Sequence, residues 1–136
     1  MFFLANDLFG DCSSLTKVAI SSIISTIPEN VFYLCQSLVA INIPSSVNLI
    51  ESSAFGKCTS LKEITIPLNV ELIPQYCFED CTSLKKVTFK EPSKLSVIDS
   101  FAFQNCSSLL EISIPYHVTI IGESSFKNCN KLKKIT

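Results

Sequence analysis

The sequence predicts a single solenoid domain in which a coil of about 23 residues repeats along the chain. Three observations predict it: apolar residues recur at fixed intervals, each interval contains a strand-like alternation, and no charged residue occupies a recurring position. Self-similarity at such a period is typical of repeat architectures, in which each coil buries its apolar side chains against its neighbours. With 47% hydrophobic and 17% charged residues, the chain is also too apolar for disorder.

Each coil is counted from a leucine, which is taken as position 1. The leucines are Leu15, Leu38, Leu61, Leu84, Leu109 and Leu132. Positions 4, 6, 10 and 13 are apolar in every coil, position 18 is always Phe, and position 21 is always Cys. The single domain 1–136 therefore divides into a partial repeat 1–14, full repeats 15–37, 38–60, 61–83, 84–108 and 109–131, and a truncated repeat 132–136.

Three kinds of segment are expected in each coil. Alternation of apolar and polar residues up to position 6, clearest in residues 61–66, predicts a short β-strand. Proline at position 7, as in Pro44 and Pro67, ends the strand at a corner because proline donates no backbone hydrogen bond. A second short extended segment is expected at positions 10–13. Positions 14–21 are expected to have helical or turn character, with Phe and Cys on the same face of one turn.

One coil is longer than the others. Repeat 84–108 carries two extra residues around Lys90–Ser93. They are expected to bulge at the corner after the strand and to leave the core positions intact.

These residues resemble a known repeat family. The pattern L-x-x-I-x-I-P-x-x-V-x-x-I-x-x-x-A-F-x-x-C, which residues 38–58 match almost letter for letter, is similar to the BspA-type leucine-rich repeat, also called the Treponema pallidum type. The resemblance covers the whole chain. It implies a curved leucine-rich repeat solenoid with a parallel β-sheet on the concave face and short strands and helical turns on the convex side. It also implies a binding role, because members resemble bacterial surface adhesins and surface proteins of trichomonads and amoebae.

The residue types that commonly carry chemistry form no catalytic or metal-binding pattern, so no enzyme activity, cofactor or metal is expected. Six of the seven cysteines recur at position 21, where a small buried side chain is the expected role. The closest pair, Cys77 and Cys81, lacks the second pair or the histidine that a zinc site needs. His117, the only histidine, is expected in a solvated loop without a nucleophile beside it.

Charge and hydropathy argue against a nucleic-acid partner and against membrane insertion. The net charge is −1, and all 11 basic residues are lysines, whereas arginine is the preferred reader of phosphate and guanine. No apolar run approaches the roughly 20 residues that cross a bilayer. Asp7 and Asp11 interrupt the apolar N-terminus, so no signal peptide is expected. This absence and the free cysteines favour the cytoplasm, whereas the family resemblance favours the cell surface.

The outward residues of the predicted strands form the candidate recognition surface. Position 5 carries small, mostly polar residues, position 3 carries charged residues of both signs, and position 2 includes Lys62, Lys85 and Lys133. A concave strip of small side chains lets a partner approach closely, and concave solenoid faces are usual binding surfaces. The expected partner-binding residues are Lys62, Glu63, Thr65, Lys85, Lys86, Thr88, Glu111 and Ser113.

Two functions remain open. The first is non-catalytic recognition of another protein, or of a glycan, through the concave face, as in a surface adhesin. The alternative is an intracellular structural or scaffold component of a larger assembly, such as a cytoskeletal one. Because neither end carries a recognisable cap, we expect the ends to be covered by partner chains or by further repeats.

Overall fold

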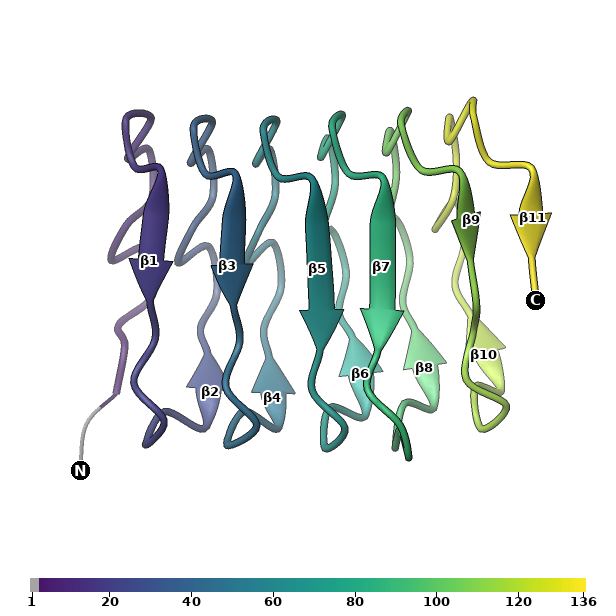
Figure 1. The fold of residues 1–136 in the computed structure, drawn as a ribbon, viewed down its shortest axis with the longest axis horizontal. Coiled ribbons are helices and arrows are strands. Elements are labelled where there is room, and N and C mark those ends of the chain that lie inside the picture. The colour runs from purple at the N-terminus through teal and green to yellow at the C-terminus, as the bar shows by residue number, and fades with distance from the viewer. Residues whose placement is uncertain (1–2) are drawn as a thin grey trace.

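The computed structural model describes residues 3–136 and shows a parallel β-solenoid whose coils stack side by side along one axis (Figure 1). Two rows of short strands lie on opposite sides of the stack and run in opposite directions. The front sheet comprises β1 (Lys17–Ala19), β3 (Ala40–Asn42), β5 (Glu63–Ile66), β7 (Lys86–Phe89), β9 (Glu111–Ile112) and β11 (Lys134–Ile135). The back sheet comprises β2 (Thr26–Ile27), β4 (Leu49–Ile50), β6 (Leu72–Ile73), β8 (Val97–Ile98) and β10 (Ile120–Ile121).

Strand pairing is parallel and places each residue beside the residue at the same position of the next coil. In the front sheet, hydrogen bonds join β1 to β3, β5 to β7 and β9 to β11, and in the back sheet they join β2 to β4 and β6 to β8 to β10. Ile64 pairs with Val87 and Ile66 with Phe89, so the apolar rows seen in the sequence become rows in space. The expected parallel sheet and the second extended segment are both confirmed, the latter at positions 12–13.

The stretch at positions 14–21 folds into tight turns, and the expected helical component is wrong for the described residues 3–136, which contain no helix. The physical reason is a pair of left-handed residues in every coil, at positions 16 and 20. They are Asp7, Asp11, Asn30, Leu34, Ser53, Lys57, Tyr76, Asp80, Phe101, Asn105, Ser124 and Asn128. A right-handed helix cannot pass through such residues, and half of them are Asn or Asp, which tolerate this conformation best.

The left-handed residues direct backbone hydrogen bonds along the solenoid axis. In repeat 38–60, the N–H groups of Ser53, Phe55 and Lys57 donate to carbonyls of the next coil at N···O distances of 3.1, 3.0 and 2.7 Å. A helix would instead direct these groups to carbonyls of its own chain segment. The turns are therefore a third contact row between coils, beside the two sheets. Side chains extend it, since Asn105 Nδ2 donates to Asp80 Oδ1 at 2.6 Å.

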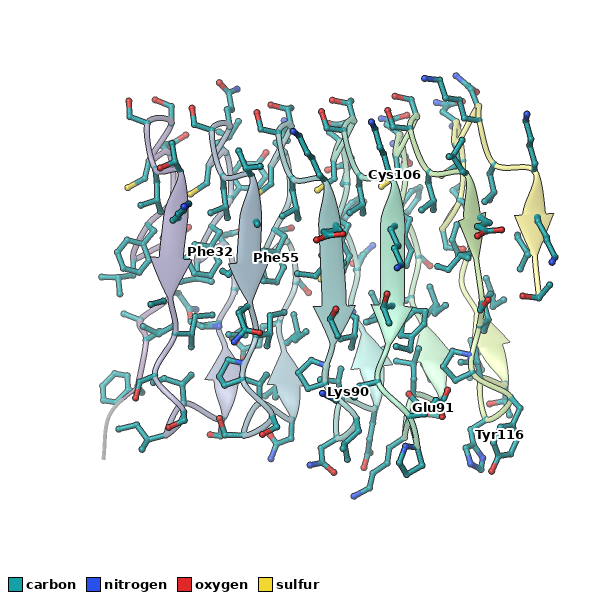
Figure 2. The ribbon with its side chains drawn as sticks, viewed as in Figure 1. Phe32, Phe55, Lys90, Glu91, Cys106 and Tyr116 are labelled. Carbon is teal, nitrogen blue, oxygen red and sulfur yellow. The ribbon has the colours of Figure 1, made fainter. Side chains whose placement is uncertain are left out.

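The core contains a continuous row of phenylalanine rings from position 18. Neighbouring rings have centroids 5.2–5.7 Å apart and lie within 21° of parallel. Phe32 and Phe55 lie side by side in adjacent coils (Figure 2), and both are fully buried. Stacking at this spacing adds to the apolar burial of each ring. Each ring within the row therefore packs against a like ring on either side, and this arrangement favours Phe at this position in every coil.

A second row is formed by the cysteines of position 21, and each buried thiol donates a hydrogen bond to the preceding coil. The Sγ atoms of Cys35, Cys58, Cys81, Cys106 and Cys129 lie 3.1–3.2 Å from the carbonyl oxygens of the position-18 phenylalanines in the preceding coil. The sequence predicted only small buried side chains here. The structure adds a polar contact that neither Ala nor Val could make.

The long coil and the end coils depart from the regular pattern. Lys90 and Glu91 are exposed at the corner after β7 (Figure 2), while Leu95 and Ile98 remain fully buried. The expected bulge with an intact core is therefore confirmed. In the first described coil, Phe3 is 80% exposed and borders an apolar hollow of about 510 Å³.

Candidate recognition surface

All eight residues predicted from the sequence lie exposed on the front sheet or at the ends of its strands. Glu63 and Thr65 belong to β5, Lys86 and Thr88 to β7, and Glu111 to β9. Lys62 and Lys85 directly precede β5 and β7, and Ser113 directly follows β9. Strand alternation explains this placement, because positions 3 and 5 face solvent when positions 4 and 6 face the core.

Pairing in register fixes the order of these side chains. Glu63 lies beside Lys86 and Thr65 beside Thr88. Adjacent strands of a sheet are about 4.8 Å apart, so each pair forms one step of a regular row.

The same rows continue at the flanks of the strands. The backbone N–H of Lys85 donates to the carbonyl of Lys62 at 2.8 Å. The hydroxyls of Ser113 and Thr136 lie 3.1 Å apart. Every member of the candidate surface is thereby held on hydrogen-bonded backbone instead of on a free loop.

The front face is hollowed where it carries its smallest residue. Ala40 lies on β3 between Lys17 on β1 and Glu63 on β5, and Lys17 is its partner in the pairing register. The hollow there has a volume of about 360 Å³ and is also bordered by Asn42 and Thr65. A side chain of a partner could enter this space without displacing any core residue.

Burial makes six of the cysteines unreactive in the folded chain. All seven are free, and six of them are buried. Burial raises the pKa of the Cys35 thiol from 9.0 to about 11, and it raises the pKa values of the Cys81 and Cys106 thiols well above 9.0. A buried neutral thiol is a poor nucleophile and a poor metal ligand.

The remaining chemical groups form no further site. Among residues 3–136, no group of three or more His, Cys, Asp and Glu side chains is placed to hold a metal ion. His117 lies in an exposed corner with its ring centroid 3.8 Å from that of Tyr116. Over the same described residues, no helix has the length and hydropathy to span a bilayer.

Comparison with known proteins gives the family. The sequence model of the BspA type leucine rich repeat region matches residues 3–133 in six copies. The chain belongs to the BspA-type leucine-rich repeat family. The family resemblance read from the repeat pattern is thus confirmed. In this BspA-type chain the number of copies equals the number of Phe–Cys pairs at positions 18 and 21, and the matched region holds all eight residues of the candidate surface.

Solved structures of similar proteins share this fold. A leucine-rich cell surface protein of Faecalibacterium prausnitzii is 33% identical, with a TM-score of 0.90, over 98% of this chain and 36% of its own. A leucine-rich repeat protein of Bacteroides ovatus is 29% identical, with a TM-score of 0.92, over 98% and 34%. The leucine-rich repeat protein of T. pallidum is 26% identical, with a TM-score of 0.70, over 96% and 71%. No curated protein matches the chain.

This BspA-type chain spans about a third of the length of the first two of these structures. What they share with it is therefore the repeat region.

Three lysines that share the front face were not among the eight predicted residues. Lys17 and Lys134 occupy position 3 of their coils, and Lys133 occupies position 2. All three are exposed. The signal that could have found them is the charge summed along position 2, and along position 3, over all coils, because residues taken one at a time include both lysines and glutamates.

Proposed function

We propose that this chain is a non-catalytic recognition module that binds another protein through its front sheet. The observation that carries the proposal is the continuous row of exposed small hydroxyl side chains, from Thr65 through Thr88 and Ser113 to Thr136, on hydrogen-bonded strands. Small side chains let a partner approach the strands closely, and charged residues on the flanking positions supply orientation.

The family supports this proposal over an enzyme. BspA-type relatives are repeat proteins, and the one from F. prausnitzii is described as a cell surface protein. The buried thiols are protonated, and His117 lies in an exposed corner outside the front strands, so neither supplies a thiolate or imidazole to the front face. Display at a cell surface is part of the proposal, with a glycan as the alternative ligand class on the same face.

Site-specific photo-crosslinking tests the face. Benzoylphenylalanine is placed at Thr65 on the front sheet or, as the matched control, at the equally exposed Thr119 beside the back sheet. Each protein is irradiated with an extract of the source cells, and adducts are identified by mass spectrometry. We expect a discrete adduct from Thr65 that is absent from Thr119 and that disappears when Thr88→Tyr is added.

Equal adduct patterns from the two positions, or adducts that Thr88→Tyr leaves unchanged, would show that the front sheet is not the binding face. A glycan array probed with the unmodified chain and with the Thr65→Tyr/Thr88→Tyr variant identifies the ligand class. Binding of a glycan that the variant loses, without any protein adduct, would replace the protein partner by a carbohydrate.

A further inference from the structure

The surface of the molecule is divided by charge, although its net charge is only −1. Positions 2 and 3 of the front sheet carry six lysines and two glutamates, a net charge of +4. These residues are Lys17, Lys62, Glu63, Lys85, Lys86, Glu111, Lys133 and Lys134. The turns, corners and back sheet carry the other five lysines and ten acidic residues, a net charge of −5. The overall composition therefore hides a basic front face.

Within the front face, position 2 contributes +3 of this net charge of +4, and Lys17 at position 3, which pairs with Ala40, contributes the rest. In the position-3 row, Glu63 pairs in register with Lys86, and Glu111 pairs with Lys134. The position-2 row contains Lys62, Lys85 and Lys133 and no acidic residue. We call these three lysines the basic row.

The basic row is accessible and is interrupted once, by the exposed Leu110 between Lys85 and Lys133. Its backbone is fixed, because the N–H of Lys85 donates to the carbonyl of Lys62 at 2.8 Å, and the N–H of Lys133 donates to Leu110 at 2.9 Å. All three side chains are exposed. With strands about 4.8 Å apart, the row extends roughly 14 Å from Lys62 to Lys133.

We propose that the basic row binds an acidic stretch of an extended polypeptide that crosses the front strands along the solenoid axis. A β-like segment advances about 3.3 Å per residue, so about five residues span the row. This inference rests on the proposed recognition function and names the chemistry of its partner. Complementary charge steers such a partner to this face and away from the acidic remainder of the molecule.

A polypeptide fits better than a uniform polyanion. Glu63 and Glu111 lie in the adjacent row and repel a ligand that carries charge at every unit. Thr65 and Thr88 next to them offer hydroxyl groups to neutral parts of a peptide, and the hollow at Ala40 can accept a side chain. Lysine also lacks the bidentate fork that favours phosphate and sulfate groups.

Fluorescence anisotropy tests the proposal with a labelled octapeptide of alternating Glu and Ser, compared with the alternating Lys and Ser peptide. The front variant Lys62→Gln/Lys85→Gln/Lys133→Gln removes the basic row. The control variant Lys90→Gln/Lys94→Gln/Lys127→Gln removes three exposed lysines that lie outside the basic row, in the corner after β7 and in a turn. We expect the front variant to weaken binding of the acidic peptide about tenfold, the control to change it less than about twofold, and raised salt to weaken the wild type.

Equal weakening in both triple variants, or no binding of the acidic peptide, would overturn the proposal. Tighter binding of a pentathymidylate, whose four phosphodiester charges match the four glutamates of the peptide, would also overturn it, because that shows attraction of any polyanion. If sedimentation shows that the chain self-associates in a salt-dependent way and the front variant does not, the ligand of the basic row is a second copy of this chain and the proposed partner is wrong. If the Thr65 crosslink persists while the acidic peptide fails to bind, the recognition function stands and the partner chemistry proposed here is wrong.

Discussion

Replacing Cys81 by alanine removes one member of the cysteine row and separates its two contributions to stability. The Cys81 side chain is fully buried, and its Sγ donates to the carbonyl oxygen of Phe55 at 3.2 Å. Loss of a buried group of about methylene size costs about 1 kcal/mol, and the small cavity left behind adds to it. Loss of the thiol hydrogen bond costs about 0.5–1 kcal/mol more. The expected total is about 1.5–2.5 kcal/mol.

Cys77 provides the matched control within the same coil. It is also fully buried, but its thiol has no hydrogen-bond partner within residues 3–136. The neighbouring coils carry Ala54 and Ala102 at its position, so Cys77→Ala introduces a residue that the stack already accommodates. We expect Cys77→Ala to cost about 1 kcal/mol, because only packing is lost.

Equilibrium unfolding in urea measures both variants. With a slope of about 2 kcal/mol per molar urea, Cys81→Ala should lower the midpoint by about 1 M and Cys77→Ala by about half as much, at unchanged slope. The difference between the two variants is the contribution of the thiol–carbonyl contact. Equal midpoints for the two variants would refute the reasoning and reduce the cysteine row to a packing feature.

Three further predictions concern the glycines, the left-handed turns and the thiols. Gly122→Ala should be strongly destabilising in thermal unfolding, because a Cβ there would lie 2.4 Å from the backbone N of Ser100. Gly56→Ala should cost less, because its Cβ would press mainly on the Tyr33 ring, which can move. A larger loss of stability for Gly56→Ala than for Gly122→Ala would contradict the contact geometry. Ser53→Val should lower the free energy of unfolding in urea by about 1–2 kcal/mol, because a β-branched side chain is strained at φ 56°. Ser53→Gly should leave the free energy of unfolding unchanged or raise it. A Ser53→Val variant as stable as the wild type would refute this prediction. Raising the pH above about 9 should destabilise the fold, because thiols then ionise in the unfolded chain but stay protonated when buried. For Cys35 this loss runs from pH 9.0 to about 11, so Cys35→Ala should show a shallower fall in the urea midpoint between pH 8 and pH 10.5, and an unchanged fall would contradict it.

Most of the fold could be predicted because each position of the repeat occurs five or six times. One copy of a strand such as residues 61–66 is ambiguous, but six copies of position 4 and five of position 6, all with Ile, Val or Phe, are not. The same redundancy located the corner insertion at Lys90–Ser93. The turns were predicted less well, because Leu34, Tyr76 and Phe101 give no local sign of a left-handed conformation. Their backbone is set by hydrogen bonds to the next coil, which single-coil propensities do not contain.

The candidate surface could likewise be predicted only in part from the sequence. Strand alternation was enough to place Thr65, Thr88 and their neighbours on one exposed face. The repeat register also places Lys62 and Lys133 at one position, but the contrast between this basic face and the acidic turns, corners and back sheet follows from how the coils are arranged in space.

The sequence by itself determined the period, the residues that point inward and the family, because these are properties of one coil written repeatedly. Only the tertiary structure decided which contacts join one coil to the next and how they arrange the surface. It set the left-handed turns, the thiol of Cys81 on the carbonyl of Phe55, and the basic row on one side of a nearly neutral molecule. The physical reason is that a coil of this size buries too little to fold alone, so contacts with neighbouring coils fix its conformation and arrange its surface.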